Sequence, residues 1–314
     1  MLRLQTVLCA FDFSDASRQA LVDAADLAER SHAALHLLHV NPLFRARLAH
    51  AGPDPDGGFR QQARTFVDDV LGADHAFEVL APVVHESHGE TPAGGIRRYA
   101  DAIEADVVVM GTHGRRGLEQ LFIGSVAAET LRQSGVPVLV VPERAERTAP
   151  GPDAPVLVGV DFSDHTAPAL DLARSFGEAY GAPIALAHVR DVPPDTVLSA
   201  PYRPHPTPEP YRSWEAAHEA LEALLTDAER ADEAVGRFAP HGQPAPGLVE
   251  IATRETAGLV VVGTHGRTGW DRVRLGSVAE AVVRDAPCPV LVVPTPSAPP
   301  HAVTVTDRAS APAS

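Results

Sequence analysis

Short runs of apolar, often β-branched residues alternate along the chain with longer segments whose apolar positions recur at helical spacing. The runs V-V-V-M at 107–110 and V-L-V-V at 138–141 have no polar alternation, as expected of strands buried on both faces. Strands that alternate with helices predict a parallel sheet built from right-handed crossovers. In the first half we expect strands at Thr6–Ala10, Leu35–Val40, Phe77–Val84, Val107–Met110 and Val136–Val141, and helices at Ser14–Ser31, Gly58–Leu71, Thr91–Ile103 and Ser125–Gln133.

The pattern occurs twice because the sequence is an internal duplication. Residues 5–40 align without a gap on residues 154–189, with 14 of 36 residues identical, and residues 110–142 align on 262–294, with 17 of 33 identical. The sequence therefore predicts an α/β fold of two tandem, doubly wound, open parallel sheets with strand order 3-2-1-4-5, a Rossmann-like arrangement. The strands expected in the second half are Val156–Val160, Ile184–Val189, Val235–Phe238, Leu259–Val262 and Pro289–Val293.

The expected units are residues 1–142 and 156–294, joined by a linker at 143–155 that is rich in Pro, Ala and charged residues. Residues 295–314 are expected to form a disordered tail. The second half also contains a segment, 191–210, with seven prolines. We expect an extended solvated loop there, and a lid or docking segment is the alternative.

Charge and cysteine usage narrow the range of functions. The formal net charge is -15 and all 26 basic residues are Arg. An acidic surface repels a polyanionic backbone, and a Walker A loop needs Lys, so nucleic-acid binding and that loop are both disfavoured.

Cys9 and Cys288 lie in or beside apolar strands and are expected to be buried thiols. With no signal-peptide layout and no apolar run near the roughly 20 residues of a membrane span, we expect a cytoplasmic protein without membrane contact.

After its fourth strand each half turns into a glycine loop with the spacing G-x2-G-x9-G-S. Polyphosphate must approach backbone N–H groups closely, and glycine removes a Cβ that would block it or forbid φ > 0. The final Gly-Ser opens a helix, so its first amides and the positive end of its dipole face the anion. One such loop is usually a tight turn, but the repeated spacing predicts two phosphate sites, at Gly111, Gly114, Gly124 and Ser125 and at Gly263, Gly266, Gly276 and Ser277.

An aspartate follows the first strand of each half, at Asp12 and Asp161. In a sheet of the predicted order, strands one and four flank the point where ligands bind, so the carboxylate and the glycine loop should converge. A carboxylate only accepts hydrogen bonds, which suits ribose hydroxyls or an exocyclic amine and not phosphate.

These features together resemble the universal stress protein family in its tandem two-domain form. The resemblance rests on D-F-S after strand one, H-V at the end of strand two, the full glycine spacing and the closing P-V-L-V-V-P, and it covers both halves. It implies ATP binding, in which the strand-one aspartate and the strand-two valine backbone hold adenosine. The glycines, the serine and the next residue would then hold the triphosphate. The additional matching positions are Val40 and Val126 in the first half, and Val189 and Val278 in the second.

The family resemblance also implies how the halves meet. Single-domain members commonly dimerise through strand five, so Val136–Val141 and Pro289–Val293 are expected to pair as a pseudo-dimer within one chain, and a homodimer of whole chains is left open. Many ATP-binding members have Pro two residues before the aspartate. Ala10 and Gly159 stand there in this chain, so we expect a changed wall of the adenine pocket.

Several other polar residues lie near the predicted sites. The H-E-S-H segment at 85–88 lacks the helical spacing of a zinc motif and indicates surface histidines. His113 and His265, inside the loops, suit a structural or nucleotide contact, with proton transfer as the alternative. Arg115 and Arg267 either reach the terminal phosphates or remain solvated.

No positioned nucleophile and no acidic cluster for Mg²⁺ stands out near either loop. We therefore expect a stress-response or regulatory protein that binds ATP at two sites and acts by binding, with Mg²⁺ as an accompanying ion left open. A slow ATP hydrolase or phosphotransferase is one alternative. A scaffold that binds another nucleotide or none is the other. A dinucleotide oxidoreductase is disfavoured because no G-x-G-x-x-G follows a first strand.

Overall fold

The computed structural model describes residues 4–41, 57–72, 80–86, 91–112, 123–143, 149–190, 213–264 and 275–294. The predicted tail and the Pro-rich segment 191–210 lie outside these ranges, as does part of the linker. The first half contains β1 (Thr6–Ala10), α1 (Asp15–Ser31), β2 (Ala34–Asn41), α3 (Gly57–Leu71), β3 (Leu80–Glu86), α4 (Pro92–Ala102), β4 (Val107–Gly111), α5 (Ser125–Gln133) and β5 (Val138–Val141). The second contains β6 (Val156–Gly159), α6 (Thr166–Tyr180), β7 (Ile184–Ala187), α7 (Trp214–Ala223), α8 (Asp227–Ala231), β8 (Gly236–Phe238), α9 (Pro244–Arg254), β9 (Leu259–Gly263), α10 (Ser277–Asp285) and β10 (Val290–Val293).

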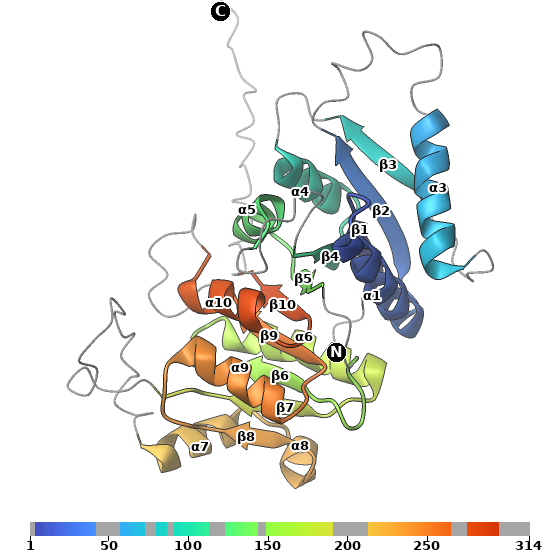
Figure 1. Ribbon diagram of the computed structural model, residues 1–314. Coiled ribbons are helices and arrows are strands. Elements are labelled where there is room, and N and C mark those ends of the chain that lie inside the picture. The colour runs from blue at the N-terminus through green and yellow to red at the C-terminus, as the bar shows by residue number, and fades with distance from the viewer. Residues whose placement is uncertain are drawn as a thin grey trace, which may run out of the picture.

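All these strands belong to one sheet, in the order β3-β2-β1-β4-β5-β10-β9-β6-β7-β8 (Figure 1). Neighbours within each half are parallel, which confirms the predicted α/β fold with a mostly parallel sheet. The halves join where β5 and β10 pair antiparallel, with Leu139 opposite Leu291. The two units thus join edge to edge in one continuous sheet, in which β5 and β10 satisfy each other's backbone groups and neither is an edge strand.

Helices cover both faces of this sheet and bury two hydrophobic cores. The strands supply alternate residues to the two sides: Val107 and Val109 face the core under α1, α3, α6 and α7, whereas Val108 and Met110 face the core under α4, α5, α9 and α10. Helices α1 and α6 cover the same face of the sheet, and the strands of the two halves run in opposite directions. The halves are therefore related by a half-turn about an axis normal to the sheet. The carboxyl ends of the strands consequently lie at opposite edges in the two halves.

The observed elements differ from the predicted ones mainly in the bounds of β3 and in one added helix. Strand β3 extends to Glu86, past the predicted end at Val84. Helix α8 was not predicted; it begins at a capping box in which Thr226 and Glu229 each bond the other's backbone N–H. No helix in the described part of the chain is both long and apolar enough to cross a membrane.

The two cysteines are buried free thiols, as predicted. Burial, with the nearby Asp23 charge as a smaller cause, raises the pKa of the Cys9 thiol to about 12. This thiol is therefore protonated at neutral pH and serves as a small apolar core residue.

Candidate functional site

Each half ends its first strand in the same tight turn. In the first half, Asp12 Oδ1 accepts hydrogen bonds from the Ser14 backbone N–H at 3.1 Å and from Ser14 Oγ at 2.5 Å. In the second half, Asp161 Oδ1 accepts the same two bonds from Ser163 at 3.0 and 2.6 Å. Both aspartates are partly buried, so the turn fixes the orientation of one carboxylate in each half.

The middle residue of each turn has a left-handed backbone, with φ of 67° at Phe13 and 57° at Phe162. This region is unfavourable for a bulky residue by about 1–2 kcal/mol, so the surroundings must hold the turn in place. Strained backbone that recurs at one position in two copies is typical of a functional turn. No local sequence feature predicts this conformation, because neither Gly nor Asn occupies the position.

The ends of each glycine loop are closed by matching backbone hydrogen bonds. Gly124 N–H donates to the Thr112 carbonyl at 2.7 Å, and Gly276 N–H donates to the Thr264 carbonyl at 2.8 Å. Thr112 and Thr264 in turn donate to β5 and β10, at 3.1 and 2.9 Å. Each loop therefore starts and ends at one point of the sheet edge. The loop interiors, with Gly114, Gly266, His113, His265, Arg115 and Arg267, lie outside the described residues.

Helices α5 and α10 begin at these closed points without a side-chain cap. Their N-cap residues are Gly124 and Gly276, and neither helix has a side-chain hydrogen bond at its N-cap. Side-chain oxygens cap α1, α4, α7 and α8, whereas α6 and α9 also lack a side-chain cap but have His165 and Gln243 at the N-cap in place of glycine. The first-turn amides of α5 and α10, at the positive end of each dipole, are thus left for another acceptor.

The N-cap glycines need a different explanation from the one that the sequence suggested. Their φ values are -55° at Gly124 and -61° at Gly276, which any residue can adopt, so positive φ is not the reason for glycine. Their own N–H groups close the loop and cannot also face an anion. The absence of a side chain over the helix end is what distinguishes them, and the donors available to a phosphate are the amides from Ser125 and Ser277 onward.

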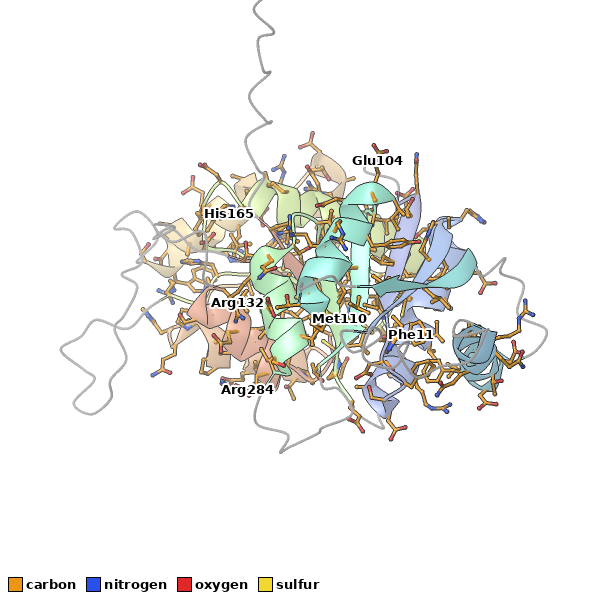
Figure 2. All side chains as sticks on the ribbon, turned by 90° about the horizontal axis from the view of Figure 1, so that it is seen from above. Phe11, Glu104, Met110, Arg132, His165 and Arg284 are labelled. Atoms are coloured by element: carbon orange, nitrogen blue, oxygen red, sulfur yellow. The ribbon has the colours of Figure 1, made fainter. Side chains whose placement is uncertain are left out.

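Gly111 has a packing role, because a Cβ there would lie 2.7 Å from Ala16 Cβ and 2.8 Å from the Ala16 backbone carbon. Only glycine lets the end of β4 approach the first turn of α1 this closely. Since α1 starts from the Asp12 turn and β4 leads into the loop, this contact brings the two parts of the predicted site together. Strands β1 and β4 are also direct neighbours, and in Figure 2 Phe11 and Met110 mark where their carboxyl ends lie.

Comparison with known proteins shows the family of the chain. A model of the universal stress protein family matches residues 3–142 and again residues 154–294. The chain belongs to the universal stress protein family. It is 31% identical over 243 residues to universal stress protein Rv1996 of Mycobacterium tuberculosis, which covers 76% of this chain and 73% of that protein. A universal stress protein of Mycolicibacterium smegmatis is 34% identical over 243 residues, 74% of each chain.

The fold of this universal stress protein also matches solved structures over nearly its whole length. A universal stress protein from Archaeoglobus fulgidus superposes with a TM-score of 0.63 at 20% sequence identity, covering 92% of this chain and 96% of that one. The tandem arrangement in one chain is therefore shared with a member of the family whose structure is solved.

The strand-two valines lie in different surroundings in the two halves. Val40 is half-buried and packs on the same core as Val126 of α5. Val189 is 6% exposed, and a Cβ on Gly247 of α9 would lie 2.9 Å from both of its methyl groups. The second half thus packs α9 tightly against the position that the family resemblance assigns to adenosine.

The positions where a family proline was expected belong to the core. Ala10 is buried. A Cβ on Gly159 would lie 3.0 Å from Leu248 Cδ1 of α9, so that side chain fills the space above the glycine. The expected change in the wall of the adenine pocket stays a prediction.

Among the described residues of this universal stress protein, no group of three or more His, Cys, Asp or Glu side chains is arranged to hold a metal ion. Sequence reasoning missed two residues that touch the aspartate turns, His39 and His188. Both lie directly before the strand-two valine, and the repeated H-V pair was the signal that pointed to them.

Proposed function

We propose that each half binds an adenine nucleotide, that ATP is the preferred ligand, and that the protein acts by binding and not by turnover. One observation carries the proposal: in both halves a glycine-started, uncapped helix end and a turn that fixes an aspartate follow two neighbouring parallel strands. The uncapped amides favour phosphate. The carboxylate, which only accepts hydrogen bonds, favours ribose hydroxyls or the adenine amine.

Within this proposal the residues have distinct roles. Gly111 admits α1, Gly124 closes the loop, and the amides of Ser125 and Val126 meet the phosphates, while Asp12 holds adenosine. The residues that we assign to the two sites are Asp12, Val40, Gly111, Gly114, Gly124, Ser125 and Val126 in residues 1–142, and Asp161, Val189, Gly263, Gly266, Gly276, Ser277 and Val278 in residues 156–294.

The first test identifies the ligand. The full chain is purified without added nucleotide and denatured, and any released nucleotide is identified by mass spectrometry. Calorimetric titration with ATP, ADP, AMP and cyclic nucleotides follows, with and without Mg²⁺. We expect two equivalents of ATP per chain. Binding of a different nucleotide or of none would support a scaffold instead, and multiple turnover of ATP would support a hydrolase.

The second test separates the two sites. In Gly124→Asp, the φ of -55° accommodates the new residue, and Asp is a better N-cap than Gly by roughly a few tenths of a kcal/mol. Its carboxylate would bond the first-turn amides and repel phosphate. We expect this variant to lose one equivalent of ATP while its unfolding temperature is unchanged or higher. Gly276→Asp should lose the other equivalent.

The matched control is Ser213→Asp, which adds the same charge at the N-cap of α7, a helix that carries none of the residues assigned to either site. This variant should retain both equivalents. If Gly124→Asp and Gly276→Asp each still bind two ATP molecules, the helix ends are not the phosphate sites.

A further inference from the structure

One histidine contacts each aspartate turn from the neighbouring strand. We propose that these histidines, His39 and His188, are positioning residues, an inference that rests on the proposed nucleotide sites. Each holds the aspartate turn in the conformation that binds the adenosine part of the nucleotide. Neither is assigned to contact the nucleotide itself.

The first contact fixes the residue before the aspartate. His39 Nδ1 lies 2.8 Å from the Phe11 carbonyl oxygen, and His188 Nδ1 lies 2.7 Å from the Val160 carbonyl oxygen. A carbonyl only accepts, so Nδ1 carries the proton and donates in both halves. The N–H groups of Phe11 and Val160 donate to the Leu38 and Ala187 carbonyls, at 3.0 and 2.8 Å. The second strand therefore holds both backbone polar groups of the residue that precedes each aspartate.

The second contact fixes the residue after the aspartate. The His39 ring lies 5.2 Å from the Phe13 ring, and the His188 ring lies 4.7 Å from the Phe162 ring, measured between centroids. These are the two phenylalanines with positive φ. In each half, one imidazole thus bonds the carbonyl of the residue before the aspartate and packs against the ring of the residue after it.

The histidine also links the turn to the other predicted adenosine contact. His39 and His188 are followed directly by Val40 and Val189, whose backbone is assigned to adenosine. A movement of the imidazole would therefore shift both adenosine contacts. The helix end that we assign to phosphate is held by other contacts. In the first half Gly124 at the start of α5 bonds Thr112, and in the second half Gly276 at the start of α10 bonds Thr264.

Because the aspartate turn and the helix end are held by separate contacts, replacing the histidine should weaken binding of the adenosine part of the ligand and leave phosphate binding unchanged. The experiment uses the full chain carrying Gly124→Asp, so that only the second site is read, and adds His188→Phe or His188→Asn. Phe retains an aromatic ring but cannot donate, whereas the Asn amide can donate from nearly the position of Nδ1. Calorimetry measures the affinity for ATP and for inorganic tripolyphosphate, and thermal unfolding is followed alongside.

We expect His188→Phe to weaken ATP binding about tenfold, the size of one lost hydrogen bond to a buried carbonyl. Tripolyphosphate binding should be unchanged, and His188→Asn should restore ATP affinity to within about threefold of the parent. Equal ATP affinity in the parent and in His188→Phe would overturn the positioning role. A parallel loss of ATP and tripolyphosphate affinity would also overturn it, because it would indicate general destabilisation.

The chain that carries only Gly124→Asp is the parent in this experiment, and its own binding distinguishes failure of the positioning role from failure of the proposed function. If the Gly124→Asp parent binds tripolyphosphate but not ATP, or binds neither, the nucleotide site itself is wrong and the positioning role falls with it. If the parent binds ATP and only the His188 comparison fails, the nucleotide site stands. Should His188→Phe not fold, the same comparison is made with His39→Phe and His39→Asn in the Gly276→Asp chain, and the same outcomes decide it.

Discussion

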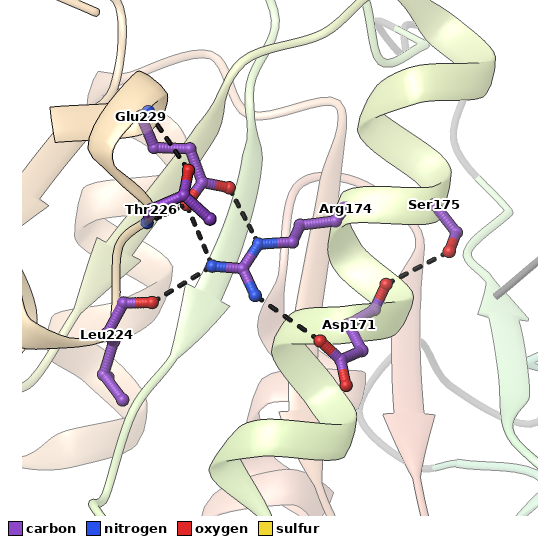
Figure 3. A network of polar contacts seen from close by, with 6 residues as sticks. All are labelled: Asp171, Arg174, Ser175, Leu224, Thr226 and Glu229. Carbon is purple, nitrogen blue, oxygen red and sulfur yellow. Dashed lines mark hydrogen bonds and ion pairs between the residues drawn. The ribbon is translucent and has the colours of Figure 1, made fainter. Parts of the chain in front are cut away.

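Arg174 and Glu229 form a two-bond ion pair between α6 and α8, with Nε to Oε1 at 2.8 Å and Nη2 to Oε2 at 2.9 Å (Figure 3). The Arg174 Nη2 group also donates to the Leu224 carbonyl at 3.0 Å, and Glu229 Oε2 accepts from the Thr226 N–H at 2.7 Å. Both side chains are about one-fifth exposed, at 20% and 18%. This pair therefore holds the connection between α7 and α8 against α6.

Replacing Glu229 should destabilise the protein. We expect Glu229→Gln to lower the free energy of unfolding by about 2 kcal/mol at neutral pH, because it weakens charge-assisted hydrogen bonds and the capping box. Chemical denaturation followed by circular dichroism measures the change. The control is Asp171→Asn, whose carboxylate lies 3.4 Å from the same guanidinium but is 67% exposed, and which should change stability little.

The same pair should give a defined pH dependence. The hydrogen bonds from Arg174, more than that from Thr226 and against the opposing effect of burial, lower the pKa of Glu229 to about 2. A group with a depressed pKa stabilises the fold above its unfolded pKa of about 4.3, and that stabilisation is lost as the pH falls through the folded value. The stability difference between wild type and Glu229→Gln should shrink from about pH 4 to pH 2. A difference that stays constant over this range would contradict the assignment.

Adding a methyl group at Gly111 should disturb the first site. The new Cβ of Gly111→Ala would lie 2.7 Å from Ala16, so α1 must move away from β4, at a cost of about 1–3 kcal/mol. Because α1 begins at the Asp12 turn, we also expect weaker ATP binding in the first half alone, measured in the Gly276→Asp chain. Gly135→Ala is the control, since nothing lies within 4 Å of its added Cβ. Equal stability of the two variants would show that the contact is not tight.

The contact between α1 and α6 tests the junction between the halves. Arg30 of α1 stacks over the Tyr180 ring of α6 at 4.7 Å and pairs with Asp26 at 2.9 Å. Burial, and then the Asp26 carboxylate and a hydrogen bond to it, raise the pKa of Tyr180 well above its usual range. We expect Tyr180→Phe to lower the free energy of unfolding by about 1 kcal/mol at pH 7.

The sign of the pH effect at Tyr180 is opposite to that at Glu229. A group with a raised pKa contributes stability below its unfolded value, about 10 for tyrosine, and this contribution decreases as the pH rises further. Wild type should thus lose its advantage over Tyr180→Phe between about pH 10 and pH 11, in denaturation experiments at both values. An advantage that persists unchanged would show that the hydroxyl does not bond Asp26 in solution.

Much of the fold could be predicted because strands buried on both faces must be apolar throughout. The predicted bounds Thr6–Ala10 and Ser125–Gln133 agree with β1 and α5. Helix α8 escaped prediction because five residues are too few for an amphipathic period, although T-D-A-E at 226–229 is a capping-box sequence. The pairing of β5 with β10 joins segments that are distant in the sequence, so it was expected only from the family resemblance and not from any local pattern.

The candidate site was predicted in part. Local spacing located the aspartate turns and the glycine-started helices, since both are short-range features. It could not distinguish the roles of the glycines, because Gly111 is required by a helix far away in the sequence, whereas Gly124 is not required by its own φ. The left-handed Phe13 and the buttressing His39 depend on tertiary packing in the same way. A homodimer of whole chains remains a prediction, which light scattering would test.

The pairing of β5 with β10 brings together two surfaces that are encoded at separate places in one chain. An interface between identical subunits must be self-complementary, so every substitution appears on both sides at once. Here Asp26 and Arg30 face Tyr180, whereas the aligned position of Tyr180 in the first half is Ser31. Because both halves belong to one chain, this contact is not constrained by symmetry, and each side of the junction can change by mutation without altering its counterpart.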